Sequence, residues 1–344
     1  MWIDSALSSI IFVTPYSHGP NKGSMGTYAY KMIQELEKQN IYSRVLMVRA
    51  TNIGYLWRLL YPILDSWTLL KWNDKYIYVH YAFFLNFIFL LPFLFFSRKK
   101  VIIQIHEYWK YLPFSRIIRI FDLLYCKLAD AIVVHNVEQF RELQELWFWN
   151  IHLLQMPIDE YNITEYPHKL ETIELLMHGG IIRKKWFDIG IKVMSILPDN
   201  YHLTIVWWIW DAIYFRELQE IIQVMNLSSK ITIIPEALPD QEYEKYIQGA
   251  DILLYPYRHG TASAALADGA LKFEKVFIAS DIQLFRDYLG VDYHYYFDIG
   301  SLVSLRDQIM KADRVEIRRF SQDLKDQYSW SKVWAFLSNI LHQL

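Results

Sequence analysis

The sequence predicts two α/β domains, each with a parallel sheet that is covered by helices on both faces. Short apolar, β-branched runs alternate with longer segments of helical periodicity, and this alternation occurs twice along the 344 residues. A polar segment with two prolines, from Pro157 to Glu171, separates the two sets. At roughly 150 residues per domain, the length also fits two domains. We predict domains at 1–160 and 161–328, with a terminal helix at 329–344 that packs back on the first domain.

The first set contains six short runs of strand length that are rich in β-branched and aromatic residues. These predicted strands are 9–14, 44–48, 76–80, 101–105, 131–134 and 151–154. Between them lie longer segments whose apolar residues recur at helical spacing. These predicted helices are 24–39, 113–127 and 137–146.

The second set repeats the pattern. Its predicted strands are 173–177, 202–206, 231–234, 252–255, 276–279 and 293–297. Its predicted helices are 187–196, 211–225, 240–248, 263–272 and 302–311, followed by 315–325 and 329–342. Open parallel sheets bind ligands beyond the carboxyl ends of their strands, so the functional residues are expected in the loops that lead from strand to helix.

The composition excludes several classes of protein. The 35 Lys and Arg residues and 37 Asp and Glu residues leave a formal net charge of −2, without the basic surplus of a nucleic-acid-binding protein. The single cysteine, Cys126, cannot form an intramolecular disulfide, and no Cys/His cluster has the spacing of a metal site. We expect no metal and no nucleic-acid partner. Because the first residues carry Asp4 and no basic segment, we expect a cytoplasmic protein.

The run from Ala82 to Phe96 is apolar on all sides. It has about 15 residues, which is short of the roughly 20 that span a bilayer. Two interpretations stay open. It is either a buried core helix or a helix at the inner membrane surface, where Arg98, Lys99 and Lys100 would meet anionic headgroups in a peripheral contact.

Two loops of the first domain carry groups that suit a ligand. Gly23 and Gly26 follow the first predicted strand and open a helix, where backbone N–H groups can approach a phosphate or sugar oxygen. His106 follows the strand at 101–105 and can donate to a ligand, with the neighbouring Glu107 fixing its tautomer. An ordinary flexible turn and a structural histidine are the alternative interpretations.

A third loop, HGGIIRKKWFD, follows the first strand of the second domain. Gly179 and Gly180 allow a tight turn. Arg183 and Lys185 then present a forked guanidinium and a point charge, a pair that suits a diphosphate. A solvated basic surface run is the alternative.

The fourth loop follows the strand at 252–255. Thr261 or Ser263 could cap the next helix and leave amides near Gly260, Thr261 and Ala262 free for a sugar hydroxyl or a phosphate. Asp268 lies about two turns into that helix. It is either a ligand-facing carboxylate or an ordinary surface residue.

Together these loops resemble the GT-B glycosyltransferases, and among them the retaining family 4 group, which uses nucleotide-sugar donors. The resemblance covers nearly the whole chain. It rests on the glycine loop, on the His106-Glu107 pair, on GGIIRKKWFDIGI and on ADILLYPYR…KVFIASD. It implies the GT-B fold, with two Rossmann-like doubly wound domains facing a central cleft, and a donor that lies mainly against the second domain.

The resemblance also implies roles for individual residues. Arg183 and Lys185 would neutralise the diphosphate leaving group, His106 would contact the donor sugar, and Gly23 and Gly26 would lie near the phosphate or the acceptor. Fixed cations stabilise the charge that develops on the leaving phosphate, so no metal or other cofactor is expected. The implied partners are a nucleotide-sugar donor, such as a UDP- or GDP-sugar, and a glycan or lipid-linked acceptor.

The chain departs from the family pattern at the donor sugar. The family usually carries two glutamates eight positions apart, one for the donor sugar and one for the ribose. Here the first position falls near His259 or Gly260, and the second is best matched by Asp268 with one extra residue. We therefore expect donor contacts from Gly180, His259 and the backbone amides of the fourth loop, with Asp268 at the ribose.

Tryptophan stands where the family has glycine. The chain has 12 Gly and 13 Trp, and its glycine share is about half the usual roughly 7 %. The positions concerned are Trp147, Trp149, Trp186, Trp207, Trp208 and Trp210. We hypothesise that these residues are glycines in the organism, encoded by UGA codons that were translated as Trp. Real divergence to a degenerate cleft is the alternative, and Trp330 is expected to be genuine.

The function expected from these observations is transfer of a sugar from a nucleoside-diphosphate donor to a polysaccharide, glycolipid or other envelope acceptor. Retention of the anomeric configuration is implied by the family resemblance alone. Two alternatives share the fold. One is a non-catalytic protein that binds a nucleotide or a sugar, and the other is a sugar-nucleotide epimerase, which would need carboxylates at the cleft.

Overall fold

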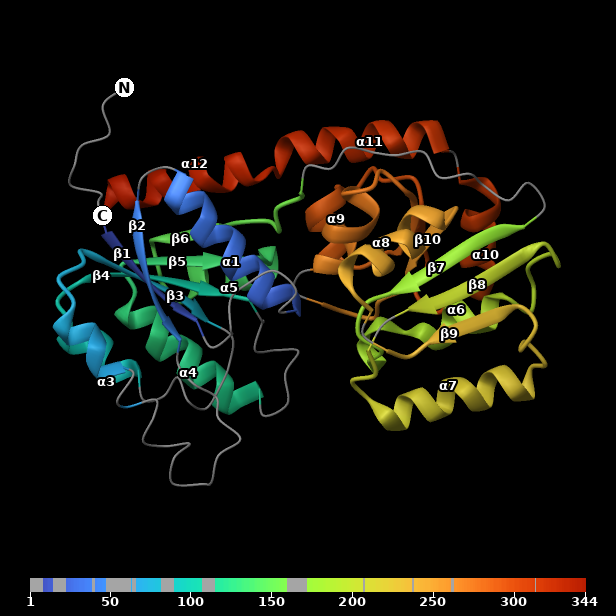
Figure 1. Ribbon diagram of the computed structural model, residues 1–344, viewed down its shortest axis with the longest axis horizontal. Coiled ribbons are helices and arrows are strands. Elements are labelled where there is room, and N and C mark those ends of the chain that lie inside the picture. The colour runs from blue at the N-terminus through green and yellow to red at the C-terminus, as the bar shows by residue number, and fades with distance from the viewer. Residues whose placement is uncertain are drawn as a thin grey trace. The chain divides into compact units, whose positions relative to one another are not determined.

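The chain divides into two compact units, Met1–Gln155 with Trp330–Leu344, and Met156–Ser329 (Figure 1). Each contains a six-stranded parallel sheet, which confirms the predicted pair of doubly wound α/β domains. The computed structural model describes residues 9–14, 23–38, 41–47, 63, 66–81, 90–106, 115–159, 172–206, 208–236, 238–260, 263–312 and 314–344.

The first unit has the strand order β2-β1-β3-β4-β5-β6. Its strands are β1 (Ser9–Thr14), β2 (Tyr42–Met47), β3 (Tyr76–Tyr81), β4 (Lys100–Ile105), β5 (Ala131–Val134) and β6 (Ile151–Leu153). Its helices are α1 (Gly23–Lys38), α3 (Leu91–Phe96), α4 (Ser115–Leu128), α5 (Val137–Glu145) and α12 (Trp330–Gln343). All strand pairs are parallel, so each return of the chain crosses over the sheet.

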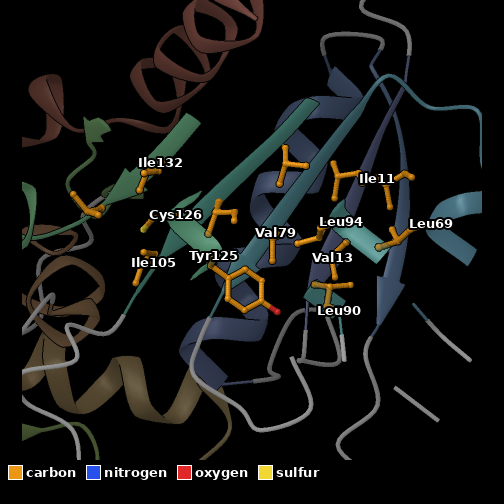
Figure 2. Packing of buried hydrophobic residues seen from close by; sticks show 14 of the residues in the cluster. Ile11, Val13, Leu69, Val79, Leu90, Leu94, Ile105, Tyr125, Cys126 and Ile132 are labelled. Atoms are coloured by element: carbon orange, nitrogen blue, oxygen red, sulfur yellow. The ribbon is translucent and has the colours of Figure 1, made fainter. Parts of the chain in front are cut away.

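Both faces of the first sheet are buried, which explains why its strands read as continuous apolar runs. Alternate residues such as Ile11, Val13 and Val79 belong to a core that also includes residues of α3, α4 and α5 (Figure 2). The intervening residues face the other way, where the rings of Phe12 and Tyr78 stack 5.2 Å apart.

The second unit has the strand order β12-β11-β10-β7-β8-β9. Its strands are β7 (Ile173–His178), β8 (Tyr201–Val206), β9 (Ile231–Ile234), β10 (Ile252–Tyr255), β11 (Val276–Ser280) and β12 (Tyr296–Phe297). Its helices are η4 (Arg183–Lys185), α6 (Phe187–Val193), α7 (Ala212–Val224), α8 (Asp240–Gly249), η5 (Leu266–Leu271), α9 (Gln283–Leu289), α10 (Leu302–Lys311) and α11 (Arg314–Gln327). Here η4 is a 3₁₀-helix and η5 is a π-helix.

Two elements are shorter than the sequence predicts. The strand expected at 293–297 is confined to β12, because Tyr293 is held in another way: its ring stacks on Phe277 at 4.9 Å and its hydroxyl donates to the carbonyl of Phe277. The helix expected at 187–196 ends with α6. Beyond it, the N–H groups of Ile196 and Leu197 both donate to one acceptor, the carbonyl of Val193, in place of the regular bonds of a continuing α-helix.

Three further segments differ from the prediction. The helix expected at 263–272 is a π-helix over η5, and the short helix α9 was not predicted. In the apolar run from Ala82 to Phe96, the described α-helix is α3, which starts at Leu91. The run's first eight residues lie outside the described part of the chain.

Trp147 occupies a position that is normally reserved for glycine. It follows the C-cap of α5 with a φ of 66°. Its N–H donates to the carbonyl of Gln144, and the N–H of Phe148 donates to the carbonyl of Leu143. This is the Schellman pattern, whose left-handed residue is usually Gly and sometimes Asn. The same pattern ends α7, where Asn226 takes the left-handed position with a φ of 55°.

Trp186 is the second tryptophan in the left-handed region. It joins η4 to α6 with φ 52° and ψ 46°. Arg98 and Glu274 also have a positive φ. A side chain in this region places its Cβ close to its own backbone, which costs about 1–2 kcal/mol per residue, and glycine avoids this cost.

We expect Trp147→Gly to raise the free energy of unfolding by about 1 kcal/mol, because it relieves the left-handed strain. The Trp147 side chain is 74 % exposed, so little buried area is lost. Urea unfolding followed by far-UV circular dichroism measures the change. Trp149, which is 82 % exposed and outside the left-handed region, provides the control, since Trp149→Gly should bring no gain. An unchanged or lower stability of Trp147→Gly would contradict the prediction.

Candidate functional site

The order in which the chain adds strands to the second sheet reverses between β7 and β10. From β7 the chain adds β8 and β9 on one side, and it then returns to place β10 on the other side. Ligands of open α/β sheets bind beyond the carboxyl ends of the strands at such a switch point. The loops after β7 and β10 are joined here, because the N–H of Arg258 donates to the carbonyl of Lys184 at 2.9 Å.

Each of the two joined loops places a side-chain cation over an aromatic ring of the other loop. Lys185 of the first loop places its Nζ 5.3 Å from the centre of the Tyr257 ring. Arg258 of the second loop places its guanidinium 4.6 Å from the centre of the Trp186 ring. Cation–π contacts of this kind hold both positive charges at the switch point.

Lys185 has no ion pair with any residue that the structure describes. Burial, and to a smaller extent the charge of Lys184, lowers the pKa of Lys185 to about 7. Gly179 makes room for the ammonium group, because a Cβ at Gly179 would collide with the Nζ of Lys185. With a φ of 89°, Gly179 also has a backbone conformation that suits glycine. A desolvated ammonium without a carboxylate partner is a site that favours an incoming anion.

The side chain of Arg183 contacts α7 and not the ring that Lys185 contacts. Its guanidinium forms a two-bonded ion pair with Glu217 of α7, at 2.8 and 2.7 Å, and lies 4.8 Å from the centre of the Tyr214 ring. The predicted pair of Arg183 and Lys185 is therefore not assembled around one point in this structure. The loop of Lys185 is joined instead to the loop of Arg258.

His178, the last residue of β7, is the centre of a buried hydrogen-bond network. Its Nδ1 lies 2.5 Å from the hydroxyl of Tyr243, and its Nε2 lies 2.7 Å from the hydroxyl of Tyr255. Burial, helped by the charge of Lys185, lowers the pKa of His178 to about 3, so the imidazole is neutral. The Tyr255 hydroxyl donates to the carbonyl of Ala265, so His178 donates from Nε2 and accepts from Tyr243 at Nδ1.

The same Tyr255 hydroxyl interrupts the helix that follows. It donates to the carbonyl of Ala265 and accepts from the N–H of Ala270, two groups that are five residues apart in the segment that forms η5. Gly269 permits this arrangement, because a Cβ there would lie 2.5 Å from the His178 ring and 2.9 Å from the Tyr255 oxygen. π-helical turns of this kind are frequent at functional sites.

Asp268 belongs to η5 and is half-buried. Its negative charge acts on this network. The pKa of Tyr243 is raised mainly by burial and next by the charge of Asp268. The structure thus places Asp268 near the hydroxyl groups at the end of β7 and β10, and its role toward a ribose stays a prediction.

The other predicted donor contacts lie in the same two loops. Gly180 is covered by the indole of Trp210, whose nearest ring atoms would be 2.6 Å from a Cβ at this position. Gly260 is buried and faces Leu284, and His259 is half-buried beside Arg258. Thr261 and Ala262 lie outside the described residues.

The first unit has its own polar cluster at the carboxyl end of its sheet. His80 of β3, His106 after β4 and His135 after β5 are all buried. The ring centres of His80 and His106 are 4.2 Å apart, and those of His106 and His135 are 4.6 Å apart. Tyr28 of α1 packs edge-on against His106 at 5.2 Å and also meets Trp330 at 5.5 Å.

The hydrogen bonds of this cluster require a neutral imidazole at His135. Gln104 donates from its amide to the Tyr28 hydroxyl at 2.8 Å and to Nε2 of His135 at 2.9 Å, so His135 donates from Nδ1 to the carbonyl of Leu154. Nε2 of His106 is buried and has no hydrogen-bond partner within the described part of the chain. No three His, Cys, Asp or Glu side chains among the described residues are arranged to hold a metal ion.

The remaining predictions for the first unit fall at the edge of the described chain. Gly23 and Gly26 lie in the first turn of α1, and the rest of their loop, residues 15–22, is outside the described residues, as is Glu107.

A surface hollow of about 500 Å³ in the second unit contains none of the predicted site residues. It is lined by Pro239, Gln241, Glu242, Lys245 and Tyr246.

Sequence reasoning missed Arg258, Tyr257, His178, Tyr243 and Tyr255. Arg258 and Tyr257 lay within the fourth loop, and their position directly after a strand was a usable signal. Tyr243 could not be found in this way, because it lies on α8 and reaches His178 only through the packing of that helix against β7.

Comparisons with known proteins find similarity among solved structures. No protein-family model matches the sequence, and no curated protein matches it either. Solved structures do. Sucrose-phosphate synthase from Thermosynechococcus elongatus superimposes with a TM-score of 0.78 over 98 % of both chains at 14 % identity. HepE from Anabaena, in complex with UDP and glucose, gives 0.74 over 98 % of this chain and 100 % of its own, at 10 % identity.

The lipopolysaccharide outer core galactosyltransferase WaaB also gives a TM-score of 0.74, over 97 % of this chain and 99 % of its own, at 11 % identity. These proteins are glycosyltransferases with the GT-B architecture, and likeness at such low identity concerns the fold. This chain has the GT-B fold of two Rossmann-like domains.

We expect the folded state to lose stability as the pH falls below about 6.5. Burial lowers the pKa of His80 to about 3 and of His135 to about 4, and it holds the pKa of His106 well below its usual range. The unfolded chain therefore binds these protons first as the pH falls, and each histidine contributes a slope of up to about 1.4 kcal/mol per pH unit. Urea unfolding between pH 7.5 and 4.5 measures the slope.

His106→Gln should make this slope shallower, whereas the exposed His342 of α12 provides a control whose replacement by Gln should not. A slope that is the same in His106→Gln and the unmodified protein would show that this cluster does not set the acid sensitivity.

Proposed function

We propose that the protein is a glycosyltransferase that moves a sugar from a nucleoside-diphosphate donor to a polysaccharide, glycolipid or other envelope acceptor. The observation that carries the proposal is the ammonium of Lys185, held at the switch point of the second sheet without a carboxylate partner in the described chain. Departure of a nucleoside diphosphate leaves negative charge on its phosphates, and a fixed cation there stabilises the transition state. The fold shared with glycosyltransferases supports the same reading.

The donor would lie against the loops after β7 and β10. Lys185 and Arg258 would contact the diphosphate, since their loops are joined by a backbone hydrogen bond. Arg183 would contribute after exchanging Glu217 for the phosphate. Asp268 would accept from the ribose, and HepE, whose structure holds UDP and glucose, is a precedent for such a donor on this fold.

His106 would contact the donor sugar, because its buried Nε2 lacks a partner within the described chain. We propose that the anomeric configuration is retained and that no metal takes part, as the family resemblance implies. The acceptor would be a glycan or a lipid-linked sugar. A peripheral contact of the run from Ala82 to Phe96 with the inner face of the membrane would suit a lipid-linked acceptor, and a cytoplasmic location would suit the nucleotide-sugar donor.

A second candidate is a protein of this fold that binds a nucleotide without catalysing transfer. The observation in its favour is the indole of Trp210, which lies directly against Gly180 at the loop where the donor is proposed to bind. Binding of a nucleoside diphosphate without turnover of any UDP- or GDP-sugar would select this candidate.

We expect UDP or GDP to bind with uptake of a proton at pH 8. Lys185, with a pKa of about 7, is largely neutral at this pH, and a bound diphosphate raises that pKa and protonates it. Isothermal titration calorimetry in Tris and in HEPES measures the proton uptake. Lys185→Met should weaken binding at least tenfold and remove the uptake, because a charge-assisted contact is worth about 1.5–3 kcal/mol.

Lys311→Met, which removes an exposed lysine of α10, is the control and should change neither quantity. Unchanged affinity and proton uptake in Lys185→Met would refute the role of Lys185.

We also propose that Trp147 and Trp186 are glycines in the protein that the organism makes, together with the other tryptophans that replace expected glycines. Both have a left-handed backbone conformation, and Trp147 occupies the glycine position of a Schellman motif. Trp330, which packs against Tyr28, would remain tryptophan.

We expect tryptic peptides of the protein isolated from its own organism to carry the mass of glycine at 147 and 186, and of tryptophan at 330. Tandem mass spectrometry reads all three positions, and position 330 is the internal control. Tryptophan at 147 and 186, or UGG codons there, would disprove the proposal and leave real divergence as the explanation.

A further inference from the structure

Helices α3 and α4 cover the same face of the first sheet. Leu94 of α3 and Tyr125 and Cys126 of α4 reach into one core, as Figure 2 shows. Because both helices bury one side against the same face of the sheet, their opposite sides point away from it together.

The outer side of α4 is apolar. Ile117, Ile120 and Leu124 are spaced three and four residues apart, so they form one stripe along the helix. On α3, Phe95 and Phe96 are adjacent and pack edge-on at 5.2 Å. These five side chains are between 42 % and 67 % exposed. A helix that is apolar on its outer side as well as its inner side indicates a surface that something else covers.

The charges around this outer face are positive. Arg116 and Lys127 are exposed at the two ends of the α4 stripe, and Arg98 follows α3. The acidic residue of α4, Asp122, is buried on the inner side, and α3 has no acidic residue. Apolar side chains flanked by cations, without exposed carboxylates on either helix, are the combination that binds an anionic lipid surface.

We propose that the outer face of α3 and α4 docks on the surface of an anionic bilayer, with the apolar stripe in the headgroup region and the cations on the lipid phosphates. The contact is peripheral. Within the described chain, no helix is long and apolar enough to cross a membrane. Trp67, exposed and packed edge-on against Phe93 at 6.1 Å, adds an aromatic ring of the kind that favours a membrane interface.

A second copy of the chain fits this surface less well than lipid does. A two-fold dimer pairs the same patch on both subunits. It would therefore bring Arg116, Lys127 and Arg98 of one copy against the same cations of the other, with no carboxylate on either helix to compensate. An anionic headgroup layer supplies the missing negative charge.

The test is co-sedimentation of the full chain with vesicles of phosphatidylglycerol and phosphatidylcholine, compared with vesicles of phosphatidylcholine alone. We expect binding to the anionic vesicles that weakens as salt is added. Ile117→Gln with Ile120→Gln, and separately Arg116→Glu with Lys127→Glu, should each reduce the bound fraction at least tenfold in partition coefficient. All four side chains are exposed, so the variants are expected to fold.

The matched control is Ile213→Gln with Val224→Gln, which removes two exposed apolar side chains from α7 of the other unit and should leave vesicle binding unchanged. Equal binding to both kinds of vesicle, absence of binding, or equal binding by the variants would overturn the proposal. So would a dimer in light scattering that Ile117→Gln with Ile120→Gln abolishes.

Nucleotide binding, measured on the same samples, keeps this inference separate from the proposed transferase. The lipid variants should bind UDP or GDP as the unmodified protein does, and Lys185→Met should bind vesicles normally. If the unmodified protein binds UDP or GDP but does not bind anionic vesicles, the lipid surface alone is refuted.

Discussion

The parallel register of β7 and β10 determines which polar groups of the second unit can meet. Leu175 pairs with Ile252 and Leu176 with Leu253, so the strands end level with one another and Tyr255 stands beside His178. The interrupted helix η5, the close approach of Gly269 and the joined loops of Lys184 and Arg258 all follow from this alignment. One pairing in the sheet thus aligns the two loops of the candidate site.

The two units treat buried charge in different ways. In the first, burial keeps three histidines neutral, and a hydrogen bond from Gln104 does so as well for His135, so the carboxyl end of the sheet is polar without being charged. In the second, Lys185 is half-buried, with its ammonium over the Tyr257 ring and no carboxylate partner from the described chain. The first arrangement suits hydroxyl groups, and the second suits an anion.

Periodicity predicted both sheets and most helices, because parallel strands that are buried on two faces leave a strong signal. It failed where a side chain reshapes the backbone, as the Tyr255 hydroxyl does at η5. The loops of the site were predicted from their place after strands, but the partners were not. That Arg183 pairs with Glu217, and that Tyr243 reaches His178, depends on how α7 and α8 pack, which no local pattern encodes.

The place of α12 in the sequence determines when the first unit can complete its packing. Residues 330–344 belong to the first unit, where Tyr28 packs against Trp330 and the Tyr76 hydroxyl donates to the carbonyl of Leu341. A ribosome delivers them only after it has made the entire second unit, so the first unit leaves the tunnel early but waits with part of its surface uncovered. The first unit is therefore completed only after the second unit has been made, although its sheet is synthesised earlier.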